Sequence, residues 1–292
     1  MLGANIRLHL SCYLFGFYLL LTGCLTVQAP YSSIPERQSH APSGSEFAKT
    51  LQNLDPYTRE TFIMRELRRG NMPSHLRDMV PVKVSANLKN RGYTEGMIWV
   101  TPDYLAIGDD ADYIRFPMNP ITAQRIADHF GCVLPTRKLV DVIYKQAHVK
   151  LAPQPMPPDN DMVRTHRFIE HNQKILAQLP QIKKGSLIAG HKKDIVLTNR
   201  IVQRKQTVAI YGWHDSKGQA IQPLSTIHKN YYADYSHGVR LIAGMMLIDG
   251  KEYPVAEVLQ DRELAPLLSD EGALTYIRYP TEGTLIRKKW TP

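Results

Sequence analysis

Cysteine is scarce in this 292-residue chain, which contains only Cys12, Cys24 and Cys132. The first two lie in or directly after an apolar N-terminal segment, so a folded domain downstream retains Cys132 alone. A domain with one thiol forms no internal disulfide, and its stability must come from a hydrophobic core. Roughly 250 residues are enough to bury such a core in one domain or in two closely packed lobes.

Two further features are missing, and a third is weak. The chain has no internal repeat and no glycine-rich loop of the phosphate-binding kind. Lys and Arg outnumber Asp and Glu by 36 to 27, yet no short segment gathers the basic residues with interleaved aromatics. We therefore expect no nucleic-acid partner.

The N-terminus has the features of an export signal. One cation, Arg7, precedes an apolar stretch from Cys12 to Leu21 that is too short to span a bilayer comfortably. The stretch ends at Leu21-Thr22-Gly23-Cys24, which resembles the lipobox of bacterial lipoproteins, where the Cys thiol is acylated and begins the mature protein. The resemblance covers only the first 24 residues. Ordinary cleavage after Ala29 and an uncleaved membrane anchor are the alternatives.

The resemblance implies a signal peptide over residues 1–23 and a lipid at Cys24. It places the mature protein at the cell membrane or outer membrane, lipid-anchored and outside the cytoplasm. Loss of residues 1–23 removes Arg7 and no acidic residue, so the formal net charge falls from +9 to +8. This charge favours anionic lipid head groups or cell-wall polymers as neighbours, unless the surplus cations merely solvate the surface.

The rest of the chain divides into a tether and a domain. Residues 24–46 are predicted to be a flexible tether, because Pro, Ser and charged residues dominate without apolar periodicity. Residues 47–292 are predicted to form a single α+β domain. If that domain has two lobes, the proline-rich stretch near 152–160 is the place where they would divide.

Capping residues and apolar patterns give the order of the elements. Helices are predicted after Asp55-Pro56, Asn119-Pro120 and Thr136, which are typical helix starts. Two later helices are predicted over Asp161–Leu179 and Val255–Leu268. The predicted strands are Val80–Ala86, Met97–Ile107, Tyr113–Met118, Leu187–Thr198, Thr207–Trp213, Val239–Ile248 and Tyr276–Tyr279. This order predicts an α+β fold with a helical N-terminal portion packed on a mixed or mainly antiparallel sheet.

Side chains suited to chemistry concentrate between His191 and His237, on predicted strand ends and loops. We predict His214, His237 and Asp234 as catalytic residues. His237 would be the general base, and Asp234, three residues earlier in a loop, would orient it. The alternative is that Asp234 and Ser236 bond the local backbone and only shape the turn.

Aromatic and cationic side chains lie beside these groups. Trp213, Tyr232, Tyr235 and Lys193 are predicted to bind substrate, because rings stack on carbohydrate or peptide and an ammonium meets carboxylate or phosphate. The alternative places the aromatics in the core and has the paired Lys192 and Lys193 facing water.

Three histidines are candidate metal ligands. His191, His214 and His237 with one water would make a catalytic zinc site. The pattern is similar to the His…Asp…His arrangement of the D-Ala-D-Ala metallopeptidases, whose later His also follows a Trp. However, His191 and Asp194 would point to opposite faces of a regular strand, so no roles carry over. We expect no cofactor unless these histidines bind zinc.

Cys132 offers a thiol alternative. It precedes a predicted helix, whose N-terminus would lower the thiol pKa, and His237 or His214 would then act as its base. Cell-wall peptidases of the NlpC/P60 type place their Cys in a polar motif at a helix start, which this sequence lacks. A packed, inert Cys132 is the expectation.

Together these features predict a lipid-anchored cell-envelope protein. It is either a hydrolase acting on cell-wall or other envelope material through a His/Asp site, or a non-catalytic binding or assembly lipoprotein. Convergence of His214, His237 and Asp234 in one pocket would favour the hydrolase. If they lie on separate faces, the enzyme interpretation built on these three residues is abandoned.

Overall fold

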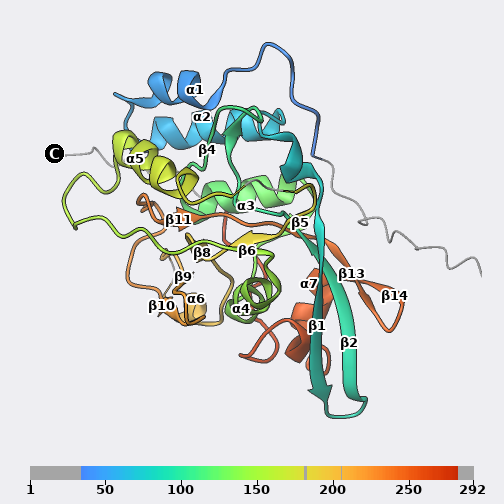
Figure 1. Ribbon diagram of the computed structural model, residues 1–292. Helices are drawn as coiled ribbons and strands as arrows, with labels where there is room; N and C mark the ends of the chain where they lie inside the picture. The colour runs from blue at the N-terminus through green and yellow to red at the C-terminus, as the bar shows by residue number, and fades with distance from the viewer. Residues whose placement is uncertain (1–33, 181–182, 205, 282–292) are drawn as a thin grey trace, which may run out of the picture.

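The computed structural model describes residues 34–180, 183–204 and 206–281 (Figure 1). The predicted signal peptide at 1–23, the lipid site Cys24 and tether residues 24–33 lie outside the described residues. No helix in the described part is long and apolar enough to cross a bilayer.

The described residues form an α+β fold, as the sequence predicts. The α-helices are α1 Gly44–Leu51, α2 Pro56–Arg68, α3 Pro120–His129, α4 Arg137–Gln146, α5 Thr165–Leu176, α6 Arg200–Gln203 and α7 Val255–Gln260, and the 3-10 helices are η1 Ser74–Arg77 and η2 Ala265–Leu267. The strands are β1 Val80–Leu88, β2 Gly92–Val100, β3 Ile107–Gly108, β4 Tyr113–Ile114, β5 Cys132–Val133, β6 Val149–Lys150, β7 Ile188–Ala189, β8 Lys193–Ile195, β9 Ile210–His214, β10 Ala220–Ser225, β11 His237–Gly238, β12 Ile242–Ala243, β13 Met245–Ile248 and β14 Lys251–Pro254.

The predicted helix starts are confirmed at three positions. The Asp55 carboxylate caps α2, the Asn119 side chain caps α3, and the Thr136 hydroxyl caps α4. Each side-chain oxygen accepts a backbone N–H that the first turn of the helix leaves without a partner. These local signals do not depend on the rest of the fold.

Two main sheets and two small two-stranded sheets, β3–β4 and β6–β7, form the β part of the described residues. The larger main sheet has the order β14-β13-β2-β12-β5, with β1 paired to β2, and all its pairs are antiparallel. Its β1–β2 hairpin extends well beyond the body (Figure 1). The smaller sheet has the order β10-β9-β8-β11, in which β8 and β11 are parallel. The sheets are therefore mixed and mainly antiparallel, as predicted.

Helices and sheets share one main core. Helices α1, α2, α3 and α5 lie together on one side of the molecule (Figure 1), with α1 against β3–β4 and α3 against β5. The main apolar cluster includes Leu67 from α2, Val82 from β1, Ile210 from β9 and Leu259 from α7. Residues on both sides of 152–160 thus contribute to the same core.

Several predicted elements differ from the structure. The stretch Leu187–Thr198 is not one strand, because Gly190 adopts a φ of 105° and divides it into β7 and β8 in different sheets. The stretch Val239–Ile248 likewise contributes to β12 and β13. The strand predicted at Tyr276–Tyr279 is wrong: the phenol of Tyr279 is buried and bonds Val196 and Ala209, and the backbone there is irregular.

The last part of the predicted tether contacts the domain. Helix α1 begins at Gly44 behind a Ser43 cap, before the predicted domain start at 47. The guanidinium of Arg37 donates to the Asn71 side chain and to the carbonyls of Ala41 and Pro42. Residues 34–43 therefore lie against the domain surface.

Candidate active site

Strand β8 presents adjacent residues to opposite sides of the smaller sheet. Lys193 pairs with Gly212 of β9, and Asp194 pairs with Tyr211. The Lys193 ammonium lies 4.7 Å from the centroid of the Trp213 ring, whereas the Asp194 carboxylate accepts a hydrogen bond from the Tyr104 hydroxyl on the other side. We call these the His237 side and the His214 side, after the histidine that each contains.

The backbone of β9 departs from strand geometry immediately before His214. Gly212 and Trp213 both have positive φ, at 111° and 60°. A positive φ is unusual for a bulky residue and costs about 1–3 kcal/mol, so the surrounding structure must impose it. As a result, Tyr211 and His214 both contact Asp141, although an unbroken strand would point them to opposite faces.

His214 is held by a carboxylate from helix α4. Its Nε2 lies 2.9 Å from Asp141 Oδ1, and the Tyr211 hydroxyl donates to the same carboxylate. The Tyr144 ring stacks on the imidazole at 4.3 Å between centroids. Asp141 and Tyr144 are three residues apart and share one face of the helix. The side chain of His214 is 2% exposed and that of Asp141 is 35% exposed, so the pair extends from the interior toward solvent.

Asp194 is a second carboxyl group on the same side. Burial removes its hydration and raises its pKa to about 6, while the charge of Arg240 acts in the opposite direction. Its Oδ2 accepts the 2.7 Å hydrogen bond from Tyr104, and its Oδ1 has no hydrogen-bond partner among the described residues. Arg240 donates to the carbonyls of Thr101 and Ile188 and stacks over the Tyr104 ring.

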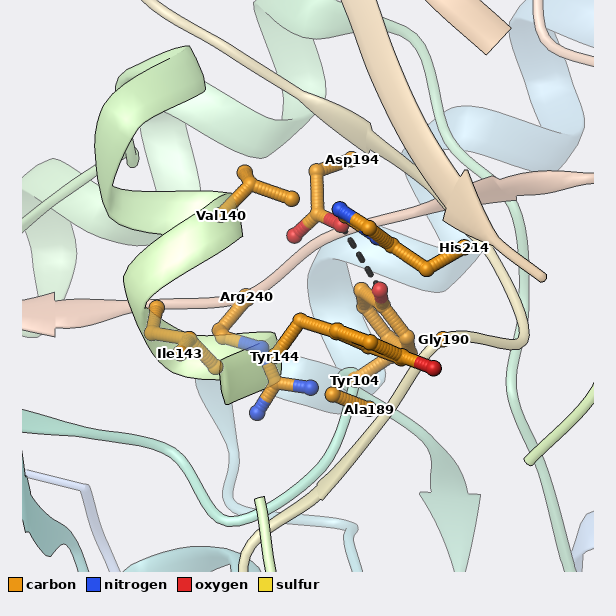
Figure 2. A pocket seen from close by; sticks show the side chains of 9 residues that line it. All are labelled: Tyr104, Val140, Ile143, Tyr144, Ala189, Gly190, Asp194, His214 and Arg240. Carbon is orange, nitrogen blue, oxygen red and sulfur yellow. Dashed lines mark hydrogen bonds between the residues drawn. The ribbon is translucent and has the colours of Figure 1, made fainter. Parts of the chain in front are cut away.

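Figure 2 shows the pocket that these groups line. Asp194 and His214 approach it from the smaller sheet, Tyr144 from α4, and Arg240 and Tyr104 from the opposite wall. A Cβ at Gly212 would lie 3.6 Å from Asp194 Oδ2 and 3.7 Å from His214 Cε1, so both side chains lie close to this glycine. The gaps among these side chains total about 180 Å³, including space open to solvent, and none of them is wide enough for a water molecule. The pocket thus holds an oriented imidazole beside a carboxyl group that titrates near neutral pH.

The other predicted catalytic pair lies on the His237 side. Asp234 accepts hydrogen bonds from the Ser236 amide and hydroxyl and from the Tyr232 hydroxyl. Burial acts to raise the pKa of Asp234, but His237, Lys193 and the Ser236 bonds keep it below its ordinary value. The hydrogen bonds between Asp234 and Ser236 are those expected if the two residues only shape the turn.

His237 is buried and unpaired. Its side chain is 0% exposed, and neither ring nitrogen has a hydrogen-bond partner among the described residues. Burial lowers its pKa to about 4, against the opposing charge of Asp234. The Tyr232 ring packs edge-on at 5.7 Å and itself stacks on His228.

The predicted substrate-binding residues gather on this side. Lys193 covers the Trp213 ring, Trp213 and Tyr235 are 6.5 Å apart between centroids, and Tyr232 contacts His237. Tyr235 and Trp213 are buried. The Tyr235 hydroxyl accepts a hydrogen bond from the backbone N–H of Met156 and donates to its carbonyl. The two buried rings are part of the core, as the alternative interpretation holds.

His214 does not join His237 and Asp234. Within the described residues no hydrogen bond, ion pair or ring contact connects them, and they lie on opposite sides of β8. The predicted three-residue constellation is therefore not assembled in the structure. The three residues were predicted to act together because they are close in sequence. In the structure, the positive φ angles of Gly212 and Trp213 in β9 turn His214 toward α4.

The three candidate zinc ligands also have different neighbours. His191 Nε2 lies 3.1 Å from Asp103 without hydrogen-bond geometry, and burial lowers its pKa to about 4. His214 contacts Asp141 and His237 has no partner, as described above. No group of three His, Cys, Asp or Glu side chains placed to hold a metal occurs in the described part of the chain.

Lys192 contradicts the expectation that the paired lysines face water. It is 0% exposed, its Nζ donates to the Tyr235 carbonyl at 2.6 Å, and it lies 3.1 Å from His171 Nδ1. Burial lowers its pKa to about 7, with further repulsion from Arg115. No sequence signal marks this residue, because its burial depends on helix α5 packing over the end of β8. Asp141 was missed for the same reason: its role arises only where α4 meets β9.

Cys132 has the environment expected of an inert thiol. It is 5% exposed within the main core, and burial raises its pKa to about 12. A thiol that remains protonated at neutral pH is a weak nucleophile. The thiol alternative has no support at this position.

Comparison of the chain with protein-family models, with curated proteins and with solved structures gave no match.

Proposed function

We propose that the protein is a lipid-anchored hydrolase of the cell envelope, and that its acid–base centre is the His214 side of β8. The observation that carries the proposal is the pairing of an oriented imidazole with a carboxyl group of raised pKa in one pocket. A buried carboxyl group with a raised pKa, placed beside a histidine that a second carboxylate orients, is typical of sites for acid–base chemistry. The envelope location rests on the lipobox at Cys24.

The roles follow from the surroundings of each group. The pocket is too narrow for a water molecule as described, so the proposal requires it to widen when substrate binds. Asp141 then accepts from His214 Nε2, and Nδ1 takes a proton from the attacking water. Asp194, protonated up to about pH 6, donates its proton to the departing group. The new hydroxyl ends on the cleaved carbonyl or sugar carbon, and proton transfer from His214 to Asp194 through solvent restores the starting state.

Burial of many polar groups around β8 supports a functional interpretation. Residues that are at most 2% exposed there include Asp103, Arg115, His171, His191, Lys192, Asp194, His214, Asp234, Ser236, His237 and Arg240. A buried charge costs several kcal/mol of desolvation, and well-packed apolar residues would stabilise the fold at least as well. Such a concentration is typical of a site kept for chemistry or binding.

Degradation of purified peptidoglycan sacculi by the detergent-solubilised full-length protein tests the activity. We expect soluble fragments to appear, and we expect His214→Gln and Asp141→Asn to remove most of that release. The control is His166→Gln, because His166 is an exposed histidine on α5 that lies 3.8 Å from Asp161 and does not line the pocket. No release from sacculi, or equal loss in the control, would contradict the proposal.

The anchor is tested separately. Cys24→Ala is expected to move the protein from the membrane fraction to the soluble fraction and to leave hydrolysis by the purified protein unchanged. Unchanged fractionation would remove the envelope assignment while leaving the chemistry of the site in place.

A binding or assembly lipoprotein is the second candidate. The narrowness of the 180 Å³ pocket and the separation of His214 from His237 favour it. It predicts that the protein sediments with sacculi but releases nothing from them, and that His214→Gln leaves sedimentation unchanged.

A further inference from the structure

A second hollow on this molecule is a groove away from both sides of β8. Helix α6 and the following Arg204 form one wall, and β10 with residues 226–227 forms the other. Its volume is about 560 Å³. Because β10 is the outer strand of the smaller sheet, the groove lies along a sheet edge. That space is comparable to sites that hold a ligand of several residues.

The charge of the groove has one sign. Arg200 and Arg204 line it, and none of its lining residues is acidic. One nitrogen of Arg200 donates to the Leu224 carbonyl at 3.0 Å, which fixes the side chain and leaves its other donors for a ligand. Neither arginine forms an ion pair within the described residues. Planar guanidinium groups bind carboxylates in a two-point geometry, so the groove suits an anion of that kind.

The remaining lining residues distinguish between anionic ligands. The groove contains no aromatic side chain, so it lacks the platform on which sugars stack. Ile227 is 75% exposed at its rim, and Ile221 of β10 is 48% exposed nearby. Gln203, Gln222, Ser225 and Thr226 supply neutral hydrogen-bonding groups. Carboxylates alternating with apolar side chains match this lining better than a glycan does.

The edge strand itself restricts how a peptide would bind. Pro223 lies in the middle of β10 and has no backbone N–H. A proline in an edge strand interrupts further ladder pairing, so simple addition of a strand is disfavoured. Recognition would therefore depend on the side chains of the two arginines and Ile227.

We propose that this groove binds a short extended peptide segment that carries carboxylate and apolar side chains. The proposal does not depend on hydrolysis at the His214 side, because binding is measured without turnover.

Fluorescence anisotropy with the full-length protein in neutral detergent tests it. The probe is a fluorescein-labelled peptide of alternating glutamate and leucine, and a peptide of alternating lysine and leucine is the charge-reversed probe. We expect the acidic probe to bind and the basic probe not to bind. Arg204→Glu should weaken binding at least tenfold, and Ile227→Ser about threefold.

Arg262→Glu is the matched control. Arg262 is exposed and does not line the groove, and its replacement by Glu changes the net charge by the same amount. Its affinity should stay within twofold of the unsubstituted protein. Equal weakening by Arg262→Glu would show non-specific attraction and overturn the proposal. Oligogalacturonate that binds as tightly and depends on Arg204 would identify an anionic glycan as the ligand class and also overturn it. Absence of binding by the acidic probe would also overturn the proposal. Circular dichroism checks that each variant is folded.

Discussion

The two sides of β8 contain similar residue types but differ in how those residues are held. On the His214 side, Asp141 accepts from the imidazole and Tyr104 donates to Asp194. On the His237 side, Asp234 accepts hydrogen bonds from Ser236 in its own turn. The imidazole of His237 has no hydrogen-bond partner in the described part of the chain. The comparison shows that a histidine close to an aspartate in sequence is oriented only where another element supplies the hydrogen bond.

The largest expected effect separates the two sides by activity. Asp194→Asn should lower hydrolysis of envelope material by about 100- to 10,000-fold, the usual contribution of a general acid. Asp234→Asn should lower it less than tenfold, because Asp234 shapes a turn. Initial rates of fragment release from sacculi measure both. Equal losses would place the chemistry on the His237 side.

The pH dependence sharpens the same test. Asp194 must be protonated to act as the acid, so kcat/KM should fall as the pH rises through about 6. This limb of the profile should disappear from the residual activity of Asp194→Asn and persist in Asp234→Asn. A limb that is unchanged in Asp194→Asn would assign it to another group.

The next effect concerns Lys192, the buried residue immediately before β8. Its pKa of about 7 in the folded protein lies below the ordinary lysine pKa of 10.5, so between these values the unfolded state holds a proton that the folded state lacks. The free energy of unfolding should therefore rise with pH in this window, by about 1.4 kcal/mol per unit from this group.

Lys192→Met should remove that rise. Urea denaturation at pH 7.5 and 9.5 measures the difference, and Lys217→Met is the control because Lys217 is exposed. An unaltered rise in Lys192→Met would show that Lys192 remains charged in the folded protein throughout the window.

A smaller effect on stability compares the two histidines directly. His237→Leu should change the free energy of unfolding by less than about 1 kcal/mol, because no hydrogen bond is lost and a buried polar ring is removed. His214→Leu should cost about 1–3 kcal/mol, since it removes the partner of Asp141 and the Tyr144 stack. Chemical denaturation at pH 7.5 measures both. A comparable loss in His237→Leu would reveal a partner for His237 in solution.

The smallest effect compares two phenols that each donate to an aspartate. Tyr211→Phe removes one donor to Asp141 and should slow hydrolysis about fivefold, the equivalent of roughly 1 kcal/mol. Tyr232→Phe removes a donor to Asp234 and should leave the rate unchanged. Rates on sacculi under identical conditions decide, and the reverse order would exchange the roles of the two sides.

Local signals in the sequence were sufficient for much of the fold. The helix caps at Asp55, Asn119 and Thr136 act within one turn of the chain. The turn at Asp249-Gly250 joins β13 to β14, with positive φ at both residues. Both kinds of feature are determined by neighbours in sequence, which is why the helix starts could be predicted.

The site depended on contacts between distant segments. The sequence of Leu187–Thr198 is consistent with one strand, and only the packing of Gly190 against the Leu151 carbonyl shows that it bends there. Asp141 is an ordinary polar position on α4 until β9 delivers Tyr211 and His214 to it. Residue types pointed to a region rich in polar side chains, but the carboxylate that holds His214 comes from another part of the chain.

The bend at Gly190 has a consequence for mutational scans. A methyl group there would lie 2.5 Å from the Leu151 carbonyl and 3.0 Å from the Tyr144 ring that stacks on His214. Gly190→Ala would displace the wall of the pocket and abolish function although residue 190 carries no reactive atom. A scan that ranks positions by lost activity would therefore rank this glycine with the chemical groups, and only thermal denaturation of the same variant would tell the two kinds of position apart.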